Sequence, residues 1–297
     1  AVLMLPIFAH PIAWMIIRVL MGICMAGLYA TTESWMHDKA DNVTRGRLIA
    51  TFQLVQYIGQ MTGQQAIRLA SPTEFMLFSL AASWIALSVL PLAFTRSDPP
   101  HPPPVPRLRL IWLYRISPVA VAAVFIAGLA NGTIWALMPV YAKLRGFDTG
   151  GVATVVAFAT IGAAASQWPA GRISDHFDRR LILLIAMIAA VIVQVLVVLF
   201  PSSNLLVVST FMFFVGAASL VIYTLATSHA ADRAGRENMV EISSGLLLTY
   251  TFGAIVGPTL AAAMMQWISP EAMFIHNAFF HSLLAIFVIW RLRKRPN

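Results

Sequence analysis

Charge is what this sequence has least of. Only 11% of its 297 residues are charged, whereas 59% are hydrophobic; a typical soluble domain carries roughly 25% charged residues. Cys24 is the single cysteine, so no disulfide can form within the chain. The sequence also lacks a Walker loop, a dinucleotide fingerprint, a Gly-x-Ser-x-Gly elbow and a convincing cluster of metal ligands. These absences argue against a soluble enzyme, an ATP-driven pump and a protein with a bound cofactor or metal.

The sequence contains instead a series of apolar runs of about 20 residues, the length that crosses a hydrocarbon core. Because lipid offers no hydrogen-bond partners to the backbone, such runs predict helices. We therefore expect an all-α polytopic membrane protein. The nine complete spans are predicted at residues 11–36, 46–70, 73–94, 116–143, 149–172, 180–200, 204–230, 241–268 and 271–292, after the end of an earlier span at 1–9.

A proline-rich segment divides these spans into two groups. Residues 95–115 include the stretch Asp98-Pro-Pro-His-Pro-Pro-Pro-Val-Pro106. Repeated prolines cannot continue a helix and favour extended geometry. We predict a linker here, between the helices at 1–94 and a six-helix bundle at 116–297.

The distribution of Lys and Arg predicts the orientation. Of the 20 basic residues, 16 fall in loops on one side of the expected membrane, and Arg18 lies inside a span. Only Arg68, Lys143 and Arg145 fall on the other side. Since cytoplasmic loops are enriched in Lys and Arg, the linker and the C-terminus are predicted to be cytoplasmic, in a bacterial inner membrane. The net charge of +8 then reflects topology in a lipid bilayer and not a nucleic-acid partner.

Two short stretches repeat along the chain with an offset of about 190 residues. Each is a basic loop followed by a helix that carries two glycines four residues apart. They are Thr44-Arg-Gly-Arg47 with Gly59 and Gly63, and Arg233-Ala-Gly-Arg236 with Gly253 and Gly257. Two similar halves in the same orientation would produce this pattern. Glycines at this spacing permit close helix approach, so we predict packing roles for both pairs.

The segment Gly171-Arg-Ile-Ser-Asp-His-Phe-Asp-Arg-Arg180 carries the most specific charge pattern. Gly171 lets the chain leave a helix tightly, and Asp175 can pair with basic groups or cap the next helix. Arg172, Arg179 and Arg180 can bridge two helix ends in one conformation and release them in another. A basic loop that merely obeys the positive-inside rule fits the spacing equally well.

This segment resembles the G-x-x-x-D-R/H-x-G-R-R/K loop signature of the major facilitator superfamily, with Asp178 where glycine is usual. Arg18-Val-Leu-Met-Gly22 is similar to the R-x-x-x-G pattern of helix 4 in that family. Glu33-Ser-Trp-Met36, followed by Thr44-Arg-Gly-Arg47, resembles the E-S-W-L and R-G segment of YcaD-like bacterial permeases. The resemblance implies two helix bundles around a central cavity. The chain would be N-terminally truncated and cover the end of helix 3 and helices 4–6 at 1–94, and helices 7–12 at 116–297.

The resemblance also implies a function. A member of this family moves a small solute by alternating access, and we expect the proton gradient to drive it and the full-length protein to be monomeric. Two alternatives remain open: a non-transporting sensor or remnant of the same fold, and an intramembrane lipid-modifying enzyme. The enzyme would need acidic or histidine groups that converge at one membrane depth.

Candidate residues for the solute path begin with Arg18. An arginine inside a span costs at least about 2.5–3.5 kcal/mol unless it is paired or hydrated, which suggests a water-filled cavity and a substrate-binding or proton-relay role. Snorkelling to the interface is the alternative. A stripe of amides on the next span either lines the cavity or packs helices together. The stripe consists of Gln53, Gln56, Gln60 and Gln64.

Asn131 and Trp135 share a helix face beside Met138-Pro139, where a bent or discontinuous helix would suit a gate and a binding surface. Simple packing is the alternative for Trp135. His281 shares a face with Asn277 and is a proton-relay candidate, unless it is only a buried, hydrogen-bonded histidine.

Glu33 lies near the cytoplasmic end of its span and can clamp Arg45 or Arg47 in one conformation; a plain interfacial glutamate is the alternative. Gly253-Ala-Ile-Val-Gly-Pro258 resembles the glycine–proline motif of some family antiporters. Because Pro258 stands on a different helix from that motif, antiport is not inferred from it.

Overall fold

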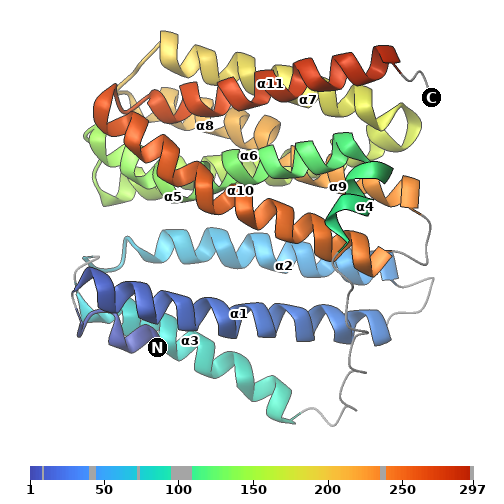
Figure 1. The fold of residues 1–297 in the computed structure, drawn as a ribbon. Coiled ribbons are helices and arrows are strands. Elements are labelled where there is room, and N and C mark those ends of the chain that lie inside the picture. Colours follow the sequence, from blue (N-terminus) through green and yellow to red (C-terminus); the bar gives the residue numbers. More distant parts are fainter. Residues whose placement is uncertain (9, 40–44, 72–73, 95–108, 235–238, 295–297) are drawn as a thin grey trace. The chain divides into compact units, whose positions relative to one another are not determined.

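The computed structural model describes residues 1–297 other than 9, 40–44, 72–73, 95–108, 235–238 and 295–297. The described part is helical and contains no β-strand (Figure 1). The chain forms two compact units, Ala1–Val105 and Pro106–Asn297. The division between them falls inside the proline-rich segment.

The N-terminal unit contains three long helices: α1 (Pro11–Lys39), α2 (Arg45–Ala66) and α3 (Phe75–Phe94). Where the end of an earlier span was expected, residues Val2–Met4 form a three-residue 3-10 helix. The indole Nε1 of Trp14 donates to the Leu5 carbonyl oxygen over 2.8 Å, which ties this turn to α1.

The C-terminal unit begins with a short helix, α4 (Leu110–Ile116), inside the segment predicted as linker. Long helices follow at each predicted span except one. They are α5 (Pro118–Leu144), α6 (Thr149–His176), α7 (Arg179–Leu199), α10 (Met239–Trp267) and α11 (Ala272–Lys294). The span predicted at 204–230 consists of α8 (Leu205–Ser219) and α9 (Val221–Ala234), which meet at Leu220.

Seven helical segments in the described part are long and apolar enough to cross a membrane. One lies in α1 and six lie in the C-terminal unit, where α8 and α9 together make one segment. The apolar part of α3, Phe75–Pro91, is shorter, and α2 is not among the seven because its glutamines interrupt the apolar run. The prediction of an all-α polytopic membrane fold is confirmed.

Small residues bring helix backbones together inside the C-terminal unit. A Cβ atom built on Gly253 or Gly257 would overlap backbone atoms of α5 at Phe125 and Leu129. A Cβ on Gly132 of α5 would lie 2.8 Å from the Ala254 carbonyl oxygen of α10. Only glycine permits such an approach. In the N-terminal unit, by contrast, a Cβ on Gly59 or Gly63 meets no described atom within 4 Å.

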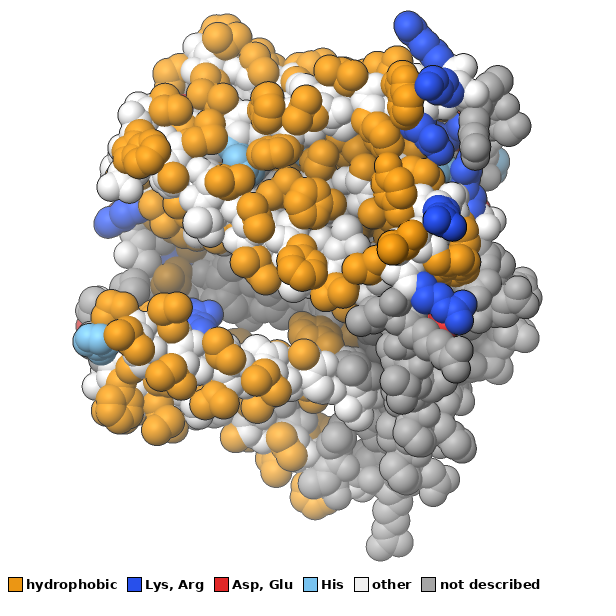
Figure 2. Space-filling view, in the orientation of Figure 1, with side chains coloured by type: hydrophobic (Ala, Val, Ile, Leu, Met, Phe, Trp, Pro, Cys, Tyr) orange, Lys and Arg blue, Asp and Glu red, His pale blue; other side chains and the backbone are white. Residues whose placement is uncertain are grey.

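Two apolar clusters fill the C-terminal unit, and α5 contributes to both. One cluster joins α5 to α7, α9 and α11 and includes Met187, Leu225 and Leu284. The other joins α5 to α6, α8 and α11 and includes Met212 and Phe274. Figure 2 shows an outer surface covered with hydrophobic side chains, while most of the Lys and Arg side chains visible on this unit gather at one end.

Candidate functional site

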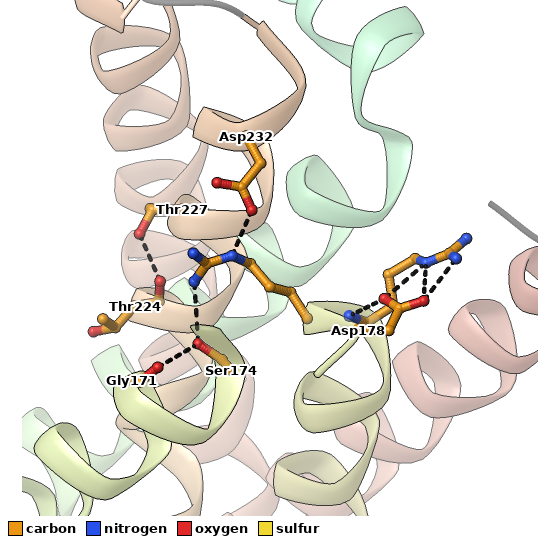
Figure 3. Close-up of polar contacts among 8 residues, drawn as sticks. Gly171, Ser174, Asp178, Thr224, Thr227 and Asp232 are labelled. Atoms are coloured by element: carbon orange, nitrogen blue, oxygen red, sulfur yellow. Dashed lines mark hydrogen bonds and ion pairs between the residues drawn. The ribbon is translucent and has the colours of Figure 1, made fainter. Parts of the chain in front are cut away.

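The segment singled out by its charge pattern forms a polar network between three helices. The helix α6 does not end at Gly171 but continues to His176, and the Gly171 carbonyl oxygen accepts from Ser174 Oγ over 2.9 Å. Arg179, at the start of α7, donates from one guanidinium nitrogen to Ser174 Oγ over 3.1 Å. Its Nε donates to Asp232 Oδ2 on α9 over 2.5 Å (Figure 3). Arg179 thus links the basic ends of α6, α7 and α9.

Asp178 caps α7. Its Oδ1 accepts from the Arg180 backbone N–H over 2.9 Å, and its Oδ2 lies 2.8 Å from Nη2 of Arg180. The hydrogen bonds from the Arg180 side chain hold the pKa of the Asp178 carboxyl below its usual range. The residue that caps α7 is therefore Asp178, which stands where the signature has glycine. The Asp175 side chain lies outside the described residues.

The three arginines of the segment have different surroundings. Arg179 reaches a carboxylate on another helix, and Arg180 is buried, with 5% of its surface exposed. The guanidinium carbon of Arg172 lies 5.4 Å from the centroid of the Trp168 ring on its own helix. Bridging between helices is therefore observed for Arg179.

A second polar group lies buried between α7, α8 and α11. Gln194 Nε2 donates to Ser219 Oγ over 2.9 Å and lies 3.4 Å from His281 Nδ1. None of these three side chains has exposed surface, and Ser219 is the last residue of α8 before the break at Leu220. Sequence reasoning missed Gln194 and Ser219. The available signal was that Gln194 is the one polar residue in 181–199, because a polar group inside such an apolar span needs a partner.

The first turns of α11 make a further buried contact with α5, next to Asn131. Asn277 Nδ2 donates to the Ala130 carbonyl oxygen of α5 over 3.3 Å, and Asn277 Oδ1 lies 2.9 Å from His276 Nδ1. Asn131 is buried, and Trp135 is half-buried against the second apolar cluster. The helix α5 is continuous through Pro139. An interruption lies instead at Leu220, between α8 and α9, where no Pro or Gly predicted it.

The opposite end of the C-terminal unit carries a buried ion pair that sequence reasoning also missed. Arg145, just after α5, pairs with Glu271, just before α11. Only 12% of the Glu271 side chain is exposed, and the Arg145 guanidinium carbon lies 5.8 Å from the centroid of the Tyr141 ring. The available signal was that Glu271 is the only acidic residue after Glu241.

The remaining candidates belong to the N-terminal unit. Arg18 is exposed on α1. On α2, Gln60 is exposed, and Gln56 and Gln64 are half-buried. The side chains of Glu33, Arg45, Arg47 and Gln53 lie outside the described residues.

Helices of membrane-spanning length, arranged in two units and carrying buried polar side chains, define a polytopic membrane protein. A model of the Major Facilitator Superfamily matches residues 1–244 and, in an overlapping match, residues 121–297. The chain belongs to this superfamily of multi-pass membrane transporters, as the loop signature predicted.

Curated relatives narrow the group within the superfamily. The uncharacterized MFS-type transporter Ent638_1421 of Enterobacter sp. (strain 638) is 30% identical over 292 residues, which cover 95% of this chain and 72% of the relative. The uncharacterized MFS-type transporter YcaD of Salmonella typhi is 28% identical over 293 residues, covering 96% of this chain and 74% of the relative. The predicted similarity to YcaD-like permeases is confirmed.

Proposed function

We propose that this protein moves a small solute across the membrane by alternating access and that proton movement drives the cycle. The observation that carries the proposal is the buried group of Gln194, Ser219 and His281 in a chain that belongs to a transporter superfamily. Three polar side chains without exposed surface stand on membrane-spanning helices. Burying such polar groups inside a membrane costs free energy, and they typically mark ion and substrate pathways.

The two ends of the C-terminal unit support an asymmetric cycle. At the basic end, Arg179 pairs with Asp232, whose side chain is 55% exposed, and an exposed pair contributes only about 0–1 kcal/mol. At the other end, the pair of Arg145 and Glu271 is largely buried, and breaking a buried pair costs more. We therefore assign opening and closing movements to the basic end. The loop arginines and the region of Glu33, Arg45 and Arg47 are proposed to stabilise the closed state there.

The solute path is proposed to run past Arg18 and the glutamine stripe of α2 in the N-terminal unit, and past Asn131 and Trp135 in the C-terminal unit. His281 is the proposed proton carrier, with Arg18 as a second candidate. What supports His281 is its burial and its contact with Gln194, because an imidazole can exchange a proton near neutral pH.

The basic end, together with the C-terminus, is proposed to face the cytoplasm of a bacterial inner membrane. The concentration of Lys and Arg supports this orientation. A single cysteine replacing Arg293 in a Cys24→Ser background should react with an impermeant maleimide only after the cells are opened. Labelling in intact cells would reverse the orientation.

Reconstitution tests the proposed coupling. The whole chain is placed in vesicles with a trapped pH-sensitive dye, and candidate solutes are added with and without a pH gradient or membrane voltage. We expect solute uptake to acidify the lumen in the wild type. His281→Gln should abolish proton movement. His176→Gln, whose imidazole is exposed at the basic end, is the matched control and should behave as wild type. Solute flux that ignores both gradients would overturn the coupling.

A further inference from the structure

A small cavity lies at the basic end of the C-terminal unit, where four helices converge. Its volume is about 20 Å³, and the residues that line it are Pro118 and Val119 of α5, Arg180 of α7, His229 and Arg233 of α9, and Arg291 of α11. Three of these six residues are arginines, and no carboxylate is among the described residues that line the cavity. The neighbouring carboxylates are already engaged, Asp178 with Arg180 and Asp232 with Arg179.

The start of α5 adds backbone donors to this cavity. This helix of 27 residues begins at Pro118, and its N-cap, Ser117, makes no side-chain capping bond. The first N–H groups of a helix have no acceptor within the helix, and they carry the positive end of its dipole. Val119 belongs to this first turn and lines the cavity. Backbone N–H groups at a helix start favour anions.

A buried nitrogen in the cavity wall points independently to a ligand. His229 is only 6% exposed, and its Nε2 has no hydrogen-bond partner among the described residues. Buried polar atoms in proteins rarely lack a hydrogen-bond partner, and an unpaired one can mark the position of a ligand or an ordered water. With its proton on Nε2, this imidazole would donate to a ligand oxygen in the cavity, and the surrounding arginines would neutralise the charge of the anion.

We propose that this cavity binds one phosphate group, with one oxygen seated among His229, Arg291 and the first turn of α5. A volume of about 20 Å³ holds little more than one water-sized atom. The rest of a tetrahedral anion therefore lies outside the cavity, at the basic end of the helices. Inorganic phosphate and the phosphodiester of an anionic lipid share this chemistry. The site is separate from the solute path and does not depend on the proposed transport cycle.

The test uses the whole chain, purified in detergent free of phosphate. In one arm, inorganic phosphate is titrated and the midpoint of thermal unfolding is measured. In the other, the protein is transferred to nanodiscs of phosphatidylcholine with or without phosphatidylglycerol, and bound lipid is counted by native mass spectrometry. Arg291→Gln is the main variant, and Arg293→Gln, on the same last turn of α11 but outside the cavity wall, is its matched control.

We expect Arg291→Gln to weaken binding in one arm by at least about tenfold, as the loss of a charge-assisted hydrogen bond implies, while Arg293→Gln binds like the wild type. Stabilisation by inorganic phosphate identifies a free anion, and selective retention of phosphatidylglycerol alone identifies the lipid headgroup. Should Arg291→Gln fail to fold, Arg233→Gln provides the same comparison. No binding in either arm, or equal binding by the Arg291 and Arg293 variants, would overturn the proposal.

Discussion

The two units of this chain are both built from long helices, yet their helices meet in different ways. In the C-terminal unit, glycines let α5 and α10 touch through their backbones, and an ion pair closes each end. In the described part of the N-terminal unit, Leu5 and Ile17 are the only buried side chains, and the glycines of α2 are open. Apolar length makes a helix membrane-spanning, whereas small residues and buried polar contacts decide how closely it packs.

Among the substitutions that test this difference between the units, Glu271→Ala should lower the unfolding free energy most. Glu271→Ala leaves Arg145 without its partner in a largely buried place, and breaking such a pair costs about 3–5 kcal/mol. Unfolding in mixed micelles, followed by tryptophan fluorescence, measures the loss. The control is Glu74→Ala, which removes an exposed glutamate of the N-terminal unit and should change little. If the two variants unfold alike, the ion pair does not stabilise the C-terminal unit.

Substitution of the packing glycines should give the next largest change in stability. Gly257→Ala drives a methyl group into the Leu129 backbone of α5, and overpacking of this kind costs about 1–3 kcal/mol. Gly63→Ala is the matched change in the N-terminal unit, where the methyl group meets no described atom. It should be neutral or stabilise α2 by up to about 1 kcal/mol. The melting temperatures of the two purified variants check the prediction, and equal shifts would contradict it.

A smaller effect is expected at the start of α7. Asp178→Ala removes the N-cap and should cost about 1 kcal/mol, whereas Asp178→Asn keeps an acceptor for the Arg180 N–H and should lose less. Hydrogen exchange of the first-turn amides of α7 reports the difference, because these amides should exchange faster in the alanine variant. Identical exchange in the two variants would mean that Asp178 acts through its charge alone.

The smallest effect is a pH dependence. The Arg180 hydrogen bond lowers the pKa of Asp178 in the folded protein below the ordinary value of 3.8. The contribution of Asp178 to folding stability is therefore fully present above pH 3.8. It is lost as the pH falls through the pKa of the folded state. The side chain is 34% exposed, and the expected size is under about 1 kcal/mol. The difference in unfolding free energy between the wild type and Asp178→Asn should become smaller as the pH is lowered below 3.8. A constant difference would contradict the pairing.

The sequence predicted the helices well because an apolar run of membrane length has one stable backbone structure in lipid. It failed at the helix ends, since nothing in the lipid argument stops α6 at Gly171, and polar residues continue the helix to His176. The break at Leu220 was also unpredictable. Its neighbours Ser219 and Val221 are not helix breakers, and the contact from Gln194 to Ser219 depends on the tertiary fold.

In the candidate site, too, the sequence identifies residues by local patterns but not their partners on other helices. The loop signature located Arg179 and Arg180, but the partner of Arg179 lies 53 residues away on α9. Charge spacing alone could not identify Asp232 as that partner. It also suggested Asp175 as a possible cap, whereas the residue that caps α7 is Asp178. Pairings between helices require the packing order, which no local pattern contains.

The backbone contact between α5 and α10 makes this helix pair a fixed reference for measuring how the other helices of the unit move. Helices whose backbones interlock at Gly132, Gly253 and Gly257 cannot slide past one another without steric overlap. Spin labels on the outer faces of α5 and α10 should therefore keep one separation throughout the functional cycle. Displacements of α7, α9 and α11 can be read as coordinates relative to that pair, so a few label pairs suffice to map which helices of this unit move.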